Sequence, residues 1–275
     1  MKPVFPVSVN AATMMPRRSL LGLASLGLSI MGCRTTSPAN GHAVDSLAGR
    51  LEGVWQFRSH TRHADGSSKS GHLHGLKFMS NGHFGLVFYK PEDSKFVGTI
   101  VGTYVALPDN RHYRENYRLF NFGRDTEAHS IVFLARFSTD AYEHVAEGIY
   151  GYDEAFARAS TGEGVPGWSG TWRLDVQRPV QTWPQAAAGT RIIIGDRFLD
   201  AWGVDTFSFL GLRTGRIARS PDGKVTLTTD IQSWEGDRTP EVVVAQKSLA
   251  AGALELQCSD GVARRLVREP PHTEV

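Results

Sequence analysis

The feature that most constrains the fold of this chain is an internal repeat. Three pairs of segments carry it: "GVWQF" at Gly53–Phe57 with "GTWRL" at Gly170–Leu174, "FMSNGHF" at Phe78–Phe84 with "IIIGDRF" at Ile192–Phe198, and "PDN" at Pro108–Asn110 with "PDG" at Pro221–Gly223. The pairs occur in the same order, at offsets of 117, 114 and 113 residues. A small, steady drift of this kind indicates that one ancestral unit was duplicated.

Each copy has the pattern of a series of short β-strands. Runs that alternate apolar and polar residues are separated by Gly, Asp-Gly, Asn-Gly and Pro-Asp turns, which is typical of antiparallel hairpins. An eight-stranded closed sheet leaves an interior that side chains or one small ligand can fill, and closure removes the exposed strand edges. The sequence therefore predicts an all-β fold of two tandem antiparallel barrels related by internal duplication.

Short motifs in the first copy resemble those of the lipocalin and calycin families. Gly53-x-Trp55 is similar to the Gly-x-Trp with which such an up-and-down barrel begins, where the Trp plugs one end. Further elements of bacterial lipocalin-like domains stand at Asp65/Gly66, His83/Phe84, Gly102/Thr103/Tyr104 and Tyr113/Glu115. The second copy retains only Gly170, Trp172 and the turn. The resemblance implies two lipocalin-like barrels, a fold that hosts both carriers and enzymes.

The N-terminal segment has the features of an export signal. Arg17 and Arg18 precede an apolar run, Leu20–Met31, which is too short to span a bilayer as a helix and is typical of a signal peptide. "IMGC", which ends at Cys33, resembles the lipobox of bacterial lipoproteins. That resemblance implies cleavage before Cys33 and attachment to the membrane by acyl chains such as palmitate. Since Arg34 rather than aspartate follows, it favours the outer membrane if the cell has two; Sec and Tat export both remain open.

These features divide the chain into five predicted segments. They are a signal peptide with lipobox at 1–32, the lipidated cysteine and a tether at 33–50, a first lipocalin-like barrel at 51–151, a linker at 152–167 and a second barrel at 168–270. The linker is expected because "YDEAFARAS" has helical propensity and the glycine-rich "TGEGVPG" follows it.

Charge and cysteine content restrict the partners. Removal of residues 1–32 removes three basic residues and no acid, so the formal net charge changes from +2 to −1. A near-neutral chain lacks the basic footprint of a nucleic-acid-binding protein. Cys258 would be the remaining thiol, which excludes an intramolecular disulfide and a cysteine metal cluster. His72 and His74 lie in a polar, solvated hairpin, so we expect neither a metal nor a cofactor.

One strand of the first copy, "HYRENYRLF", can be aligned with its repeat in two ways. Without a gap, His112 and Arg114 would point into the barrel, and burying an unpaired arginine is costly. A slip of one residue, which a β-bulge supplies, instead turns Tyr113, Glu115 and Tyr117 inward. The slipped alignment places these side chains, together with Leu119, on Val225, Leu227, Thr229 and Ile231. We choose the slip because tyrosines tolerate a barrel interior better than arginines do.

The inward-facing side chains form the candidate site. A buried Glu115 needs a donor or has a raised pKa. We expect it to orient a small, mostly hydrophobic ligand in the first barrel together with Tyr89, Tyr113 and Tyr117. A purely structural contact of Glu115 with an arginine or tyrosine is the alternative reading of the same residue.

Two other classes of protein remain open. One is an isomerase, cyclase or hydratase that uses Glu115 and His83 as an acid/base pair, although no nucleophile elbow, phosphate loop, zinc-protease helix or dinucleotide motif occurs. The other is a structural envelope lipoprotein, which would have a filled interior and an apolar surface patch. A ligand-binding protein is favoured over an enzyme.

Overall fold

The structure is a computed structural model. It describes residues 46–63, 68–69, 73–121, 130–146, 151–175, 180–184, 186–204, 208–236, 238–248 and 252–273. The predicted signal peptide, the lipobox and Cys33 lie outside these ranges. Within them, no helix combines the length and the apolar character that a membrane span requires.

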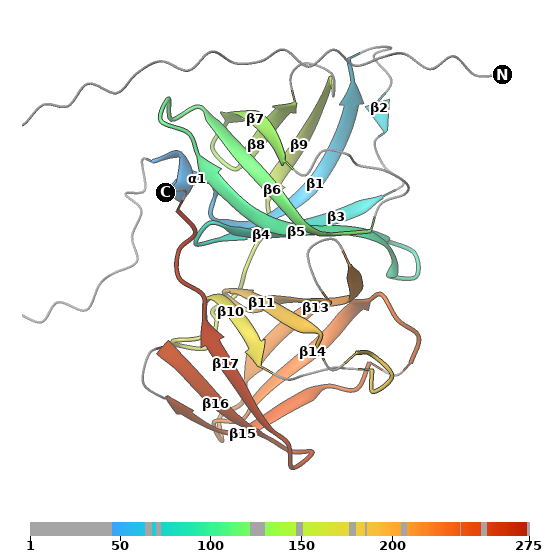
Figure 1. Cartoon of the computed structure of the whole chain (residues 1–275), viewed down its shortest axis with the longest axis vertical. Helices are drawn as coiled ribbons and strands as arrows, with labels where there is room; N and C mark the ends of the chain where they lie inside the picture. The colour runs from blue at the N-terminus through green and yellow to red at the C-terminus, as the bar shows by residue number, and fades with distance from the viewer. Residues whose placement is uncertain are drawn as a thin grey trace, which may run out of the picture. The chain divides into compact units, whose positions relative to one another are not determined.

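The first barrel is an antiparallel sheet of eight strands that closes on itself (Figure 1). Strands adjacent in sequence pair with each other, and pairing of the first strand with the last closes the ring. The strands are β1 (Gly53–Arg62), β3 (His74–Ser80), β4 (His83–Lys90), β5 (Lys95–Ala106), β6 (His112–Phe120), β7 (Ser130–Phe137), β8 (Ala141–Ala146) and β9 (Tyr152–Arg158). A two-residue strand, β2 (Ser68–Lys69), pairs with the end of β1.

The second barrel repeats this topology with eight further antiparallel strands. They are β10 (Gly170–Asp175), β11 (Ala188–Ile194), β12 (Arg197–Gly203), β13 (Phe209–Arg219), β14 (Val225–Gln232), β15 (Glu241–Ser248), β16 (Ala253–Cys258) and β17 (Ala263–Arg268). The predicted all-β fold of two tandem barrels is therefore confirmed.

One predicted segment is different in the structure. Residues 152–158 form β9, the strand that closes the first barrel, and not the beginning of a linker. The local helical propensity of "YDEAFARAS" is overridden because β9 pairs along both edges, with β8 and with β1. The first barrel thus extends to Arg158, past its predicted end at residue 151.

Each barrel is closed at one end by the same arrangement of side chains. Trp55 and Trp172 each donate the indole N–H, at 2.7 Å, to the backbone carbonyl four residues earlier. The guanidinium carbons of Arg158 and Arg268 lie 4.1 Å from the ring centroids of these two tryptophans. In the first barrel the short helix α1 (Leu47–Leu51) contributes buried leucines to this end of the core. The shared geometry supports the duplication.

A glycine-dependent bulge also occurs in both barrels. The register between β5 and β6 shifts at Gly102, and that between β13 and β14 shifts at Gly215. A methyl group on either glycine would overlap a backbone carbonyl oxygen of the neighbouring strand, that of Asn116 or of Thr228. Glycine is therefore required for the close approach of the two backbones.

The bulge confirms the one-residue slip predicted for β6. Gly102 pairs with Tyr117, as Gly215 pairs with Thr229, so Tyr117 and Thr229 are equivalent positions. Counting back along the strands makes Glu115 equivalent to Leu227, and both are buried.

The two barrels pack against each other through the same outer face of each. The buried apolar residues between them are Val54, Phe78, Val87 and Val101 of the first barrel and Ile192, Leu199, Ala201, Leu212 and Ile231 of the second. Residues at equivalent positions meet there: Phe96 stacks on Phe209 with ring centroids 6.0 Å apart, and Leu199 lies against Gly85. Contact between equivalent surfaces is typical of an isologous, twofold-related interface.

Candidate functional site

The interior of the first barrel is filled largely by aromatic side chains. Phe84, Phe133 and Phe156 are at most 1% exposed, and numerous further rings pack edge-to-face or stack with them. Where these rings lie, the predicted lumen is thus a packed core, and the polar groups inside it contact one another.

A buried ion pair lies at the centre of that interior. Lys77 of β3 donates to a carboxylate oxygen of Glu115 on β6, and the two side chains are 1% and 3% exposed. The ammonium nitrogen also lies 5.2–5.8 Å from the ring centroids of Phe84, Tyr113 and Phe156. Burying a charge is costly without such partners. Glu115 therefore faces inward as predicted, and Lys77 is the donor that its burial requires.

The second barrel contains an interior cation at the equivalent position. Arg191, which matches Lys77 at the 114-residue offset, donates to both carboxylate oxygens of Asp200 at 2.6 and 2.8 Å. Arg213 bridges Asp200 and Glu241, at 2.9 and 2.6 Å. Burial would raise the pKa of Glu241, but the charges of Arg191 and Arg213 outweigh it and lower that pKa to about 2.

The two barrels thus keep the cation and obtain its counter-charge from different strands. Where the first barrel has Glu115, the second has Leu227, and the second barrel places its carboxylates on β12 and β15 instead. A leucine is tolerated opposite Arg191 because Asp200 and Glu241 already neutralise it.

A line of hydrogen bonds begins at Tyr113, beside the buried pair, and leads away from the end of the first barrel that Trp55 closes. Tyr113, two residues from Glu115 on β6, contacts Nδ1 of His144 through its hydroxyl at 2.6 Å. Nε2 of His144 lies 2.7 Å from Glu154, whose other oxygen lies 3.2 Å from Nδ1 of His60. Exposure of the side chain increases along the line, from 2% at His144 to 14% at Glu154 and 26% at His60.

The environment of this polar line fixes its protonation states. Burial, together with the charge of Lys77, lowers the pKa of His144 and keeps the imidazole neutral. Burial would raise the pKa of Glu154, but hydrogen bonds from His144 and His60 lower it to about 2. Burial and the nearby charge of Glu115 raise the pKa of Tyr113. At neutral pH the line therefore consists of a neutral phenol, a neutral imidazole and a carboxylate.

The line is absent from the equivalent positions of the second barrel. The cross-strand pair His144 and Glu154 corresponds to Leu256 and Arg264, and Tyr113 corresponds to Val225. The polar content of the first interior is thus specific to that copy.

The structure separates the residues predicted to form the site. Tyr113, Glu115 and Tyr117 face the interior together, whereas Tyr89 points out of the barrel and packs in the layer between the barrels. His83 also points outward, where its Nε2 lies 3.3 Å from the carbonyl oxygen of Pro270. The placement of Tyr89 in the lumen is therefore wrong, and Glu115 and His83 are on opposite sides of the barrel wall, so they cannot act as an acid/base pair on one atom.

The error has a physical cause. Phe84, Leu86 and Phe88 fill the barrel, while Val87 on the other face of β4 is buried against the second barrel. A strand that is buried on both faces shows no polar face by which its orientation could be recognised.

Sequence reasoning missed Lys77, His144 and Glu154. A signal for Lys77 existed, because the match of "FMS" with "III" aligns Lys77 with Arg191, two cations that each precede an apolar run. The contact between His144 and Glu154 depends on the pairing of β8 with β9. The helical propensity of β9 did not indicate a strand.

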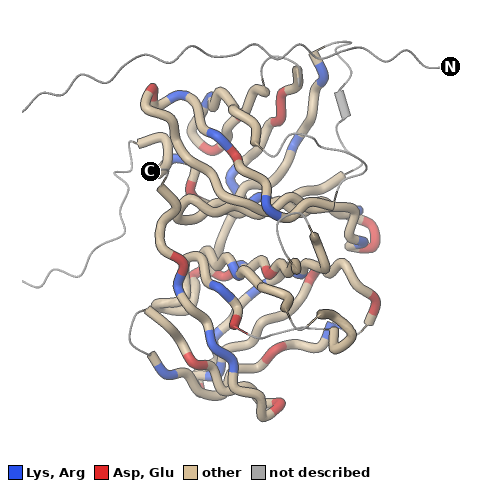
Figure 2. Tube along the Cα trace, viewed as in Figure 1, with Lys and Arg blue, Asp and Glu red and all other residues tan. Residues whose placement is uncertain are grey.

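Comparison of the chain with known protein families, curated proteins and solved structures returned no match. The comparison that informs the site is therefore that between its own two barrels. Figure 2 shows basic residues interspersed with acidic ones along both of them. In the part of the chain that the structure describes, no group of three or more His, Cys, Asp or Glu side chains is arranged to hold a metal ion.

Proposed function

We propose that this protein is an exported, lipid-anchored, lipocalin-like protein that binds a small, mostly hydrophobic ligand in the first barrel. The ligand enters at the end opposite Trp55, toward which His60, Tyr152 and Glu154 lie, and its polar group bonds to the hydrogen-bonded line there. Cys33 carries the lipid, and the outer membrane is the destination in a cell with two membranes. The second barrel serves as scaffold.

The observation that carries this proposal is the asymmetry between two otherwise matching interiors. The first barrel has a tyrosine, a histidine and a carboxylate where the second has Val225, Leu256 and Arg264. A core that only has to fold has no need of this line, since the second barrel closes without it. A few polar groups in an apolar surround are how small-molecule sites select their ligands.

The filled interior determines where the ligand is expected. The ion pair of Lys77 with Glu115 and the packed rings around it occupy the centre of the barrel. The stacked rings of His60 and Tyr152, with centroids 4.8 Å apart, lie farther out and are partly exposed. The hydrophobic body of the ligand is therefore expected to contact Tyr152 and the rings next to it, above the ion pair.

Native mass spectrometry of the protein purified from membranes tests the ligand. We expect a co-purified small molecule with the unchanged protein and a reduced amount with Glu154→Gln. The matched control is Glu143→Gln on β8, an exposed glutamate whose partner, Arg136, is on the barrel surface. No bound molecule, and no thermal shift across a library of lipids and aromatic compounds, would contradict the proposal.

The anchor is tested separately by incorporation of labelled palmitate and by membrane fractionation. The unchanged chain should be labelled and sediment with membranes, whereas Cys33→Ser should not. A labelled chain without a ligand would instead support the structural envelope lipoprotein, which the packing of both interiors favours as the second candidate.

A further inference from the structure

Two of the clefts along the interface between the barrels are counterparts of each other. The larger, of about 450 Å³, is lined by Leu76 and Tyr89 of the first barrel and by residues of β12–β14 of the second. In the smaller cleft, of about 280 Å³, the first barrel supplies the strands that the second barrel supplies in the larger one, and the second barrel supplies the counterparts of Leu76 and Tyr89. The equivalent lining positions, larger cleft first, are Leu76 and Thr190, Tyr89 and Gly203, Arg197 and His83, Asp230 and Arg118, and Ile231 and Leu119.

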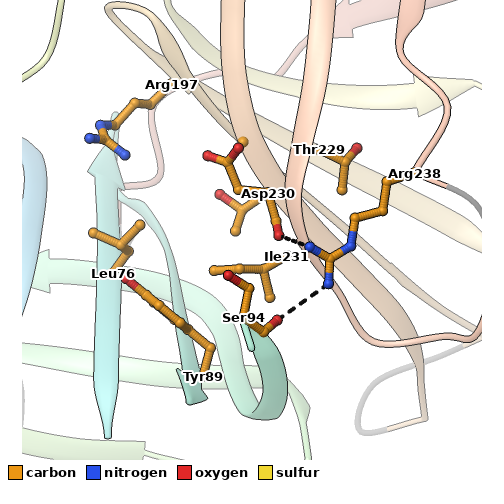
Figure 3. Close-up of a pocket in the computed structure, with 10 residues that line it drawn as sticks. Leu76, Tyr89, Ser94, Arg197, Thr229, Asp230, Ile231 and Arg238 are labelled. Atoms are coloured by element: carbon orange, nitrogen blue, oxygen red, sulfur yellow. Dashed lines mark hydrogen bonds between the residues drawn. The ribbon is translucent and has the colours of Figure 1, made fainter. Parts of the chain in front are cut away.

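The larger cleft combines opposite charges with an apolar floor. Figure 3 shows Arg197 and Asp230 of the second barrel at the space that Leu76 and Tyr89 bound from the first, with Ile231 beside them. The smaller cleft has His83 and Arg118 at the corresponding places, so both of its ionisable groups are basic. The pairing of a cation with an anion is therefore specific to the larger cleft.

The charged groups of the larger cleft are available to a ligand. Nε of Arg197 donates to the carbonyl oxygen of Ser160 at 3.3 Å, and within the described residues its other guanidinium N–H groups have no partner. Asp230 is the extra residue of the bulge in β14. Its carboxylate likewise forms no ion pair with any of the described residues. Arg238 donates to the backbone carbonyl of Asp230 and, at 3.4 Å, to that of Ser94. It thereby joins the two barrels at the edge of the larger cleft.

Tyr89 lines the same cleft as Arg197 and Asp230. Its pKa is raised, first by burial, while the charge of Arg197 lowers it and that of Asp230 raises it. The phenol is thus neutral and can donate a hydrogen bond to an anion held by Arg197.

We propose that the larger cleft binds a small zwitterion of the amino-acid type with an apolar side chain. Its carboxylate accepts hydrogen bonds from Arg197 and Tyr89, its ammonium group pairs with Asp230, and its side chain contacts Leu76 and Ile231. Guanidinium groups bind carboxylates well because their parallel N–H donors match the two oxygens. The volume is within the usual range for small-ligand sites. This site is separate from the one proposed in the first barrel.

Calorimetric titration of the purified protein in detergent with L-leucine tests the proposal. Because the cleft is partly open to solvent, we expect a dissociation constant on the order of 1 mM. L-Leucinamide, which lacks the carboxylate, and 4-methylpentanoate, which lacks the ammonium group, should each bind about tenfold more weakly or worse. Equal binding of either analogue would overturn the proposal.

Variants locate the site. Arg197→Gln and Asp230→Asn should each weaken L-leucine binding about tenfold, and Arg197→Lys should retain part of it. Arg118→Gln, at the counterpart of Asp230 in the smaller cleft, is the matched control and should bind as the unchanged chain does. Amide shifts of Leu76 and Ile231 in NMR spectra report both the contact and the integrity of the fold.

Absence of saturable binding at concentrations on the order of 10 mM, in a chain whose NMR spectrum is well dispersed, would contradict the proposal. So would binding that Arg197→Gln and Asp230→Asn leave unchanged. Neither result bears on the ligand of the first barrel, because that site shares none of these residues.

Discussion

Lys77 and Glu115 form a buried ion pair inside the first barrel, and their equivalents in the second barrel are Arg191 and Leu227. The cation is common to both copies, whereas the carboxylate has moved. Glu115 thus stands where its copy has a leucine because Lys77 has no other carboxylate in direct contact among the described residues.

The first prediction concerns this pair. Lys77→Met and Glu115→Leu should each lower the free energy of unfolding by about 3–5 kcal/mol, because each leaves an unpaired charge in an apolar interior. The double variant should recover most of that loss, since no buried charge remains. Urea denaturation of the four chains measures the coupling; losses that simply add in the double variant would show that the two side chains do not act as a pair.

The second prediction concerns the dependence of stability on pH. The pKa of His144 in the folded protein lies below the ordinary value of 6.5, so the unfolded chain binds the proton more readily. Stability should therefore be full above about pH 6.5 and fall as the pH decreases below it, by at most about 1.4 kcal/mol per pH unit for one proton. His83, whose pKa burial also lowers, acts in the same direction.

His144→Gln isolates the contribution of one imidazole. Glutamine can bond to Tyr113 and Glu154 but does not titrate, so urea unfolding between about pH 7.5 and 5 should lose the part of the slope that one proton explains. His83→Gln serves as the comparison for the residual slope. An unchanged slope in His144→Gln would mean that this histidine is protonated equally in the folded and unfolded states.

The third prediction concerns the bulge glycines. Gly102→Ala and Gly215→Ala should each lower the free energy of unfolding by about 3 kcal/mol or more, because the added methyl group overlaps a carbonyl oxygen of the neighbouring strand and the backbones must separate. Thermal denaturation compares them with Ala106→Gly, an ordinary change in the same strand as Gly102. A loss no larger than that of Ala106→Gly would contradict the required close approach.

The fourth prediction concerns the closed ends of the barrels. Arg158→Ala and Arg268→Ala each remove a guanidinium from a tryptophan face and two hydrogen bonds to backbone carbonyls. We expect losses of about 1–2 kcal/mol, similar in the two variants because the contacts are equivalent. Trp fluorescence in urea reports both. A large effect in one barrel only would mean that the two ends differ energetically.

Much of the fold was predictable from local patterns. Alternation and turn residues gave the strands, the matched segments gave the duplication, and the cost of burying arginines gave the inward face of β6. The bulge at Gly102 then confirmed the slip that this argument required. These features depend on residues close together in sequence or on a comparison within the chain.

The remainder depended on pairings that local sequence does not encode. β9 has helical propensity and becomes a strand through its two neighbours, so the contact of Glu154 with His144 could not be foreseen. Tyr89 was misplaced because Val87 and Leu86 bury opposite faces of β4. The charges in the clefts lie on equivalent surfaces of the two barrels, and only the packing of one barrel on the other brings them together.

The isologous packing of the barrels has an evolutionary consequence. In a dimer of identical subunits every substitution appears twice, once on each side of the twofold axis, so Arg197 could not arise without also replacing His83. Joining the subunits in one chain removes that restriction. The two clefts, and the two interiors with their differently placed carboxylates, can therefore differ while Gly85, Leu199 and the rings of Phe96 and Phe209 maintain the contact between equivalent surfaces.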